Sequence, residues 1–265
     1  MTNPHFVNPL KYDGTDGIWG PFKLEISAKT MDRIAATIAT QVLPKPPLQS
    51  LLRSLVESWF KAQGVMPTFF NLLQFFKGRY YMERHLDSDV VRSLCQDPLL
   101  LKALQSFLGD RFWLWRSEIL VSKPGRKIIP FWHQDRYAKF LRGPGKGMTA
   151  YIALTEVNET NGMEYMPLAY VESGDVQVAK REAEVVRIAG NHHFVVPARL
   201  ECQAIAVDLQ PGEFVLFDER LVHRSINNCG LQDRVAMAVR FVEENVEVLS
   251  GFSAIQAEPI LLEVN

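Results

Sequence analysis

The residues of this sequence that are best suited to hold a metal ion lie in the string FWHQD. His133 and Asp135 are two residues apart in a segment that is typical of a strand, and alternation along a strand puts both side chains on one face. Together they offer an imidazole nitrogen and a carboxylate oxygen. His223, in the distant string FVLFDERLVHRS, is the candidate third ligand. Two histidines and one carboxylate suit iron(II) and leave three coordination positions open.

Other residues compete for these ligand positions. Asp218 lies shortly before His223 and is an alternative carboxylate ligand, but only the HxD pair is arranged on one strand. His192 and His193 are adjacent, so in a strand they face opposite ways and cannot both bind one ion. His85 is more typical of a helix or loop residue. We therefore favour His133, Asp135 and His223.

An arginine further along the chain suggests a bound anion. Arg234 opens the apolar strand RVAMAVRFV, where a cation is costly unless it meets a negative charge. Its planar guanidinium can hold a carboxylate through two parallel hydrogen bonds. Ser225 lies on the same strand face as His223. We expect Arg234 to face an anionic group near the metal.

Further charged residues could contact a substrate. Arg116 and Glu118 share a face of the strand WLWRSEILV, where they either contact a ligand or pair with each other. A basic group after the HxD pair could hold a phosphate, a CoA group or a carboxylate, or it could be a solvated loop; it comprises Arg136, Lys139, Arg142 and Lys146.

Two kinds of element must position these side chains. An apolar stripe predicts a helix over residues 46–63, Asp97 and Gly109 delimit a second helix that begins with Pro98, and a third lies within residues 23–41. From Arg111 onward, short aromatic and β-branched runs alternate with turn clusters. These runs predict strands near residues 112–122, 131–136, 148–157, 193–197, 203–209, 213–218, 222–226 and 234–242.

This order predicts a mainly β fold with additional helices. Several short strands at such spacing are typical of a sandwich or jelly roll. No Pro/Gly/Ser-rich linker separates the halves. We therefore expect one domain over residues 1–265, in which a helical part of about residues 1–110 braces a jelly-roll core of about residues 111–245.

Composition limits the class of partner. With 47% hydrophobic and 22% charged residues the chain can bury a large core, and its net charge of -1 gives no general attraction for nucleic acid or an anionic membrane. Cys95, Cys202 and Cys229 form neither a disulfide framework nor a zinc motif. No signal peptide or membrane span is apparent. We expect a cytoplasmic protein with a small-molecule partner, no nucleic acid and no membrane; its oligomeric state is open.

The sequence resembles the iron(II)- and 2-oxoglutarate-dependent oxygenases of the phytanoyl-CoA dioxygenase type. The resemblance covers roughly residues 86–242, and its specific part is the spacing from HxD to the distal histidine and then to Arg234. The matching strings are LVSKPG, WHQD, YIALTEVNETNGMEYMP, PGEFVLFDERLVHRSINN and RVAMAVRF.

This resemblance implies a double-stranded β-helix and a set of site residues. Iron(II) would be held by His133, Asp135 and His223, while Arg234 and Ser225 would bind the distal carboxylate of 2-oxoglutarate. Tyr151 would line the cosubstrate pocket, and dioxygen would take an open metal position. The implied activity is oxidation of a small-molecule metabolite, of the hydroxylase type, with release of succinate and carbon dioxide.

One string departs from the family pattern. Where relatives carry a PGSH-like motif after the NG turn, this sequence has MPLAYVESG, so the substrates of relatives cannot be transferred. The carboxylate of Asp135 argues against halogenation, because halogenating relatives lack it. Two other functions stay open: a catalytically silent sensor that binds metal and keto acid in a jelly roll, and a cupin-like metal isomerase that needs neither oxygen nor keto acid.

Overall fold

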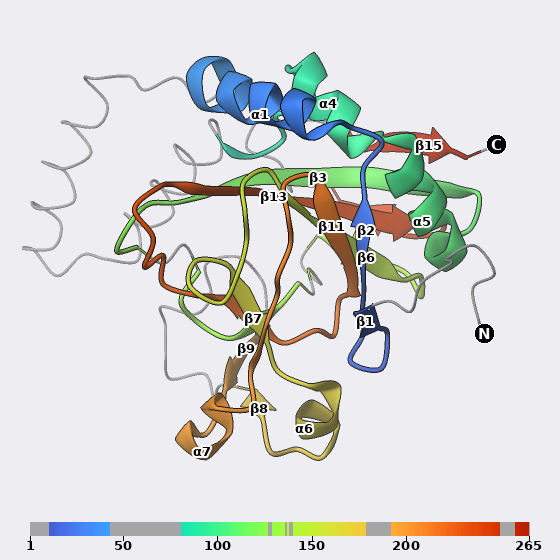
Figure 1. Cartoon of the computed structure of the whole chain (residues 1–265). Helices are drawn as coiled ribbons and strands as arrows, with labels where there is room; N and C mark the ends of the chain where they lie inside the picture. The colour runs from blue at the N-terminus through green and yellow to red at the C-terminus, as the bar shows by residue number, and fades with distance from the viewer. Residues whose placement is uncertain are drawn as a thin grey trace, which may run out of the picture.

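Two antiparallel sheets pack against each other, with helices outside each of them (Figure 1). The computed structural model describes residues 11–42, 81–126, 129–135, 137, 140–178, 192–249 and 258–264. The predicted helix over residues 46–63, together with Arg136 and Lys139, lies outside these residues. The predicted jelly roll with helices bracing a sheet is confirmed.

The larger sheet has seven strands in the order β1-β2-β11-β6-β13-β3-β15. Every neighbouring pair in it is antiparallel. In this order the strands are β1 (Tyr12–Asp13), β2 (Ile18–Lys23), β11 (Glu213–Asp218), β6 (Gly147–Ala153), β13 (Arg234–Glu243), β3 (Arg111–Ser122) and β15 (Ile260–Glu263).

The smaller sheet has six strands in the order β10-β7-β12-β4-β9-β8. They are β10 (Ile205–Ala206), β7 (Met163–Tyr165), β12 (His223–Ser225), β4 (His133–Gln134), β9 (His192–Val195) and β8 (Gln177–Val178). A separate pair is formed by β5 (Leu141–Arg142) and β14 (Glu247–Val248). The strands that carry His133 and His223 are therefore neighbours in one sheet.

Helices α1 (Ala28–Thr37), α4 (Asp89–Cys95) and α5 (Pro98–Leu108) cover the larger sheet, and α1 continues into the π-helical turn η1 (Ile38–Val42) (Figure 1). Two short helices, α6 (Leu168–Glu172) and α7 (Ala198–Glu201), lie beside the smaller sheet. The predicted limits of α5 are confirmed: the Asp97 side chain accepts from two backbone N–H groups, and Gly109 follows with a φ of 83°. None of the described helices is long and apolar enough to cross a bilayer.

Strand β13 is buried on both faces and so organises two cores. On one face Val235, Met237, Val239 and Phe241 pack with residues of α1, α4 and α5. On the other face small side chains, Ala236 and Ala238, join the cluster between the two sheets. We call this second face the inner face. Arg234 and Arg240 have the same parity as the two alanines and therefore lie at its ends.

A β-bulge in β3 sets which of its residues face inward. Arg240 pairs with Arg116 while Phe241 pairs with Leu114, so Trp115 is an extra residue in β3. Consequently Leu114 on one side and Ile119 on the other both pack with the helices. Arg116 and Glu118 then share the inner face, as their spacing predicts.

The predicted strands are found with small shifts in most of their ends. The predictions over residues 131–136 and 203–209 were too long. Only His133–Gln134 and Ile205–Ala206 are strand, and Leu209 makes an isolated bridge with Val157. Among the described elements, the sequence analysis missed strands β1, β2, β5, β7, β8, β14 and β15 and helices α4, α6 and α7.

Candidate metal centre

Three buried side chains converge between the two sheets. His133 in β4 and His223 in β12 are directly opposite each other, with ring centroids 4.2 Å apart. Asp135 follows His133 by two residues and lies on the same side. The ligand atoms of the three residues all lie within 4.8 Å of one another. This arrangement can hold a metal ion with an imidazole, carboxylate, imidazole donor set.

Both imidazoles present a free lone pair to this point. The Nδ1 atom of His133 lies 3.1 Å from the carbonyl oxygen of Phe131, and that of His223 lies 2.9 Å from the carbonyl of Leu221. Because a carbonyl oxygen only accepts a hydrogen bond, Nδ1 carries the hydrogen, and the lone pair of Nε2 is available to bind a metal ion. Burial lowers the pKa of His133 to about 3 and also lowers the pKa of His223. Both rings are thus neutral at neutral pH, as metal binding requires.

The carboxylate of Asp135 is surrounded by donors. Tyr137 Oη donates to Oδ1 at 3.1 Å, and Thr149 Oγ1 donates to Oδ2 at 3.1 Å. The guanidinium of Arg240 reaches both oxygens, with Nε at 3.2 Å from Oδ2 and Nη2 at 3.3 Å from Oδ1. Burial alone would raise the pKa of Asp135, but the positive charge of Arg240 lowers it well below its ordinary value. The carboxylate is therefore ionised.

The sequence analysis missed Arg240, which is 5% exposed. It noted RVAMAVRF only as an apolar strand beginning at Arg234. A signal was present, because Arg234 and Arg240 are an even number of residues apart and must share one strand face.

Arg234 differs from Arg240 in its partners. Its side chain is buried at 2% exposure, and its hydrogen bonds go to backbone carbonyls: Nε to Asn161 at 3.0 Å and Nη1 to Leu120 at 3.4 Å. Among the described residues, no carboxylate forms an ion pair with it. A buried cation without an anionic partner in the chain fits the predicted role in binding a carboxylate ligand.

The two other predicted cosubstrate residues lie on different sheets. Tyr151 in β6 is buried, and its hydroxyl has no hydrogen-bond partner in the described part of the protein. Burial raises the pKa of Tyr151, and the positive charge of Arg234 opposes this effect. Ser225 ends β12 on the smaller sheet, and its Oγ accepts from the backbone N–H of Ile129 at 3.3 Å.

The predicted substrate residues Arg116 and Glu118 have different partners. Arg116 Nε lies 3.8 Å from Glu83 Oε1, and its guanidinium stacks over Tyr137. Glu118 Oε2 lies 3.6 Å from Arg240 Nη1. Glu118 therefore belongs to a charged network that reaches Asp135 through Arg240, and Arg116 lies beside this network, over the same Tyr137 ring as Arg240.

Two of the alternative ligands, Asp218 and His85, have other partners. The carboxylate of Asp218 binds Arg220 at 2.7 Å. His85 is buried in the turn before α4, where Nδ1 lies 2.6 Å from Ser117 Oγ. His192 and His193 begin β9, and the structure describes nothing of their side chains. Asp135 is thus the carboxylate that meets the two histidines.

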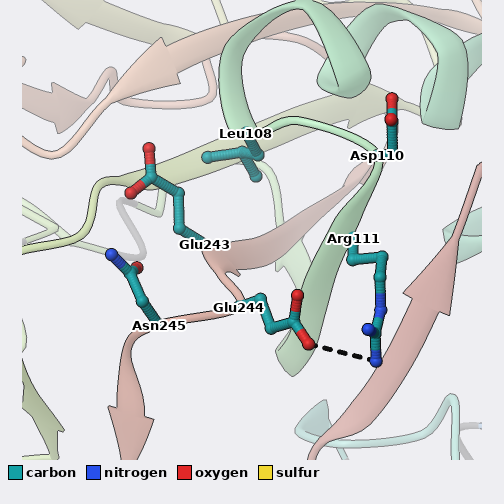
Figure 2. A pocket seen from close by; sticks show the side chains of 6 residues that line it. All are labelled: Leu108, Asp110, Arg111, Glu243, Glu244 and Asn245. Carbon is teal, nitrogen blue, oxygen red and sulfur yellow. Dashed lines mark ion pairs between the residues drawn. The ribbon is translucent and has the colours of Figure 1, made fainter.

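An open hollow elsewhere on the protein has no part in this centre. It is lined by residues at the far end of β13 from Arg234 (Figure 2), and Arg111 pairs there with Glu244 at 3.0 Å. Its lining residues are Leu108, Asp110, Arg111, Glu243, Glu244 and Asn245. None of the predicted site residues is among them.

Comparisons with known proteins agree with this geometry. The family model described as Phytanoyl-CoA dioxygenase (PhyH) matches residues 74–236. No curated protein matches the sequence.

Solved structures show the same fold at low sequence identity. The non-heme monooxygenase ThoJ, in complex with Ni, is 17% identical over 97% of this chain and 84% of its own, with a TM-score of 0.60. CytC3 with Fe(II) and alpha-ketoglutarate is 21% identical over 89% of this chain and 77% of its own, with a TM-score of 0.58. EctD from S. alaskensis is 15% identical over 91% and 78%, with a TM-score of 0.55.

Proposed function

Since the chain belongs to the phytanoyl-CoA dioxygenase family of iron(II)- and 2-oxoglutarate-dependent oxygenases, we propose that His133, Asp135 and His223 hold the iron(II) of such an enzyme. The reaction is oxidation of a small-molecule metabolite, of the hydroxylase type. The observation that supports this proposal most directly is the convergence of three buried ligand atoms from β4, its following residue and β12.

The donor set fits iron(II). Two neutral imidazoles and one ionised carboxylate would hold the ion and would leave further coordination positions for ligands. When bound there, iron(II) supplies the oxidation of a substrate C–H bond by dioxygen, coupled to conversion of 2-oxoglutarate to succinate and carbon dioxide. The backbone carbonyls of Phe131 and Leu221 hold both imidazoles in the tautomer that this binding needs.

The cosubstrate is assigned to the inner face of the larger sheet. Arg234 would bind the distal carboxylate of 2-oxoglutarate with guanidinium N–H groups other than those that donate to Asn161 and Leu120, and Tyr151 can donate its free hydroxyl hydrogen to the same molecule. Ser225 would add a donor from the facing sheet. Ala236 and Ala238, the small residues between the two arginines of β13, are buried on this face.

The substrate is assigned to the side of the centre where the charged network lies. Arg116 and Glu118 are on the inner face and are partly exposed, with 11% and 24% of their side chains accessible. Together with Arg136 they would contact polar groups of the substrate. A small molecule fits a reaction centre enclosed between two sheets.

The test combines metal binding with turnover. Purified protein is loaded with iron(II) and supplied with 2-oxoglutarate, oxygen and a library of candidate metabolites, and oxygen use and succinate are measured. We expect metabolite-stimulated succinate formation in the natural protein. His133→Ala and His223→Ala should lose iron and activity, whereas His85→Gln, a change at a buried histidine outside the centre, should keep both.

Each alternative gives a different result. Full iron occupancy and turnover in both His→Ala variants would contradict the proposed ligands. Binding of metal and keto acid without oxygen use would identify a sensor. Conversion of a metabolite without oxygen or 2-oxoglutarate would identify an isomerase.

A further inference from the structure

We propose that Arg240 is a positioning residue for the metal centre: its guanidinium fixes the orientation of the Asp135 carboxylate so that one oxygen faces the two imidazoles. This inference rests on the proposed function, because it treats Asp135 as a metal ligand. It assigns a role to a residue that lies beyond the ligand set and the cosubstrate residues.

The contacts of the Asp135 carboxylate carry the first step. Arg240 binds it with two nitrogens, one to each oxygen, at 3.2 and 3.3 Å. A bidentate pair of this kind restrains the plane of a carboxylate, which a single hydrogen bond cannot do. Tyr137 and Thr149 add one hydroxyl each, but each reaches only one oxygen. The guanidinium is therefore the one group among the described residues that restrains both oxygens.

The surroundings of Arg240 hold its guanidinium in place. Its backbone lies in the middle of the larger sheet, paired with Thr149 of β6 on one side and with Arg116 of β3 on the other. The guanidinium stacks over the Tyr137 ring at 5.1 Å from the centroid, and Nη1 lies 3.6 Å from Glu118 Oε2. Because the side chain is 5% exposed, little room is left for another arrangement.

Arg116 provides a matched comparison on the same sheet. It is the direct neighbour of Arg240 across the β3–β13 pair and stacks over the same Tyr137 ring at 5.2 Å. Its ion pair, however, is with Glu83 rather than with Asp135. Removing Arg116 takes away a similar charge from the same region without touching the ligand carboxylate.

The variant Arg240→Lys separates orientation from charge. A cation close to the centre repels a metal ion, but it also favours the ionised form of the buried carboxylate, so loss of the charge alone can change metal affinity in either direction. If Arg240 orients Asp135, its removal weakens metal binding, because partners that orient a metal ligand typically contribute about 10–100-fold in affinity. Weaker binding in Arg240→Lys, which keeps the charge but loses the contact through two nitrogens, therefore identifies orientation.

The experiment measures Co(II) affinity without 2-oxoglutarate or substrate, by calorimetry and by the visible absorption of the bound ion. We expect Arg240→Met to weaken Co(II) binding about 10–100-fold and to change the absorption spectrum. Arg240→Lys keeps the positive charge and one donor nitrogen but loses the contact through two nitrogens. Its affinity for Co(II) should therefore lie between that of the natural protein and that of Arg240→Met. Arg116→Met should bind Co(II) with the affinity of the natural protein.

Unchanged or tighter Co(II) binding in Arg240→Met would overturn the proposal. Near-ultraviolet circular dichroism shows whether each variant is folded. If Arg240→Met does not fold, Arg240→Lys decides: weaker binding supports the role, and equal binding overturns it. A natural protein that binds no Co(II) would instead contradict the metal centre of the proposed function.

Discussion

Arg234 and Tyr151 show how an unsatisfied buried group can mark a ligand site. A buried hydroxyl without a partner costs about 1–3 kcal/mol, and the buried guanidinium of Arg234, whose hydrogen bonds go to neutral carbonyls, has no carboxylate among the described residues to balance its charge. In the proposed enzyme the keto acid relieves both. These groups therefore lower the stability of the ligand-free protein and increase its affinity for the cosubstrate.

This argument predicts different outcomes for two substitutions. Arg234→Ala should raise the apparent Kd for 2-oxoglutarate by 10-fold or more, since a charged hydrogen bond contributes about 1.5–3 kcal/mol. Tyr151→Phe should raise it only a few-fold and should leave the free protein as stable or more stable, because the unsatisfied hydroxyl is gone. Calorimetric titration and urea unfolding measure the two quantities. A Tyr151→Phe protein that is clearly less stable when free of ligand would contradict the assignment.

For single residues, the sequence could indicate the metal ligands but not the side chains that hydrogen-bond to them. His133 and Asp135 are recognisable because their spacing and a strand pattern are local features. Two of the groups that hold the Asp135 carboxylate, Arg240 and Thr149, come from other strands and reach it only after the sheets form. The exclusion of Asp218 likewise needed its contact with Arg220.

Among the elements, helix α5 begins at a capping residue, Asp97, that also binds a distant segment of the chain. The Asp97 side chain accepts from the N–H groups of Leu99 and Leu100 at 3.0 and 3.3 Å. It also accepts from the N–H of Glu25 at 3.2 Å, which fixes the segment between β2 and α1. One buried carboxylate thus caps a helix and anchors a distant turn.

Asp97→Ala should therefore lower the free energy of unfolding by about 1–2 kcal/mol, at the upper part of the range for caps, because a third N–H also loses its partner. Asp89→Ala is the control. Asp89 is in the first turn of α4, its side chain is 98% exposed, and it pairs with Arg92, so its removal should cost under about 1 kcal/mol. Urea denaturation of both variants tests this; equal losses would refute the capping argument.

The elements that the sequence revealed are those with strong internal patterns. Helix α5 and strands β3, β11 and β13 have clear caps or apolar runs. Strand β2 reads IWGPFK, in which Gly20 and Pro21 are turn signals, and it forms because β11 offers it an edge with a shifted register at Phe214 and Leu216. Such a strand is decided by its neighbour, which a local pattern cannot show.

For the whole molecule, buried histidines link stability to pH. Burial, with help from Arg92, lowers the pKa of His85 to about 4. The unfolded chain, with an ordinary histidine pKa near 6.5, binds more protons than the folded one between about pH 6.5 and 4. The stability contributed by keeping His85 neutral is complete above that window and decreases as the pH falls through it.

His85→Gln should consequently flatten the acid side of the stability profile. The free energy of unfolding should fall less steeply below pH 6.5, by up to about 1.4 kcal/mol per pH unit, although the variant loses the contact with Ser117 at every pH. Urea unfolding in the presence of a chelator, at pH values from 7 to 5, gives this slope. An identical slope in the natural protein and the variant would rule out His85 as a contributor.

The overall architecture could be predicted from the order of helical and strand patterns along the sequence. Helical patterns before Arg111 and strand patterns after it predicted helices against a jelly roll, and the shared core on one face of β13 is the result. The inner face was harder to foresee, because it depends on the single extra residue in β3.

That extra residue, Trp115, has a consequence for comparing this chain with others. It lies in β3 only, so β13 and β6 remain in regular register while the inward and outward positions of β3 change places at this point. A protein with a regular strand here would be one residue shorter. We expect an alignment to such a protein to need a one-residue gap opposite Trp115; without it, the charged positions of one chain would be matched to the apolar positions of the other.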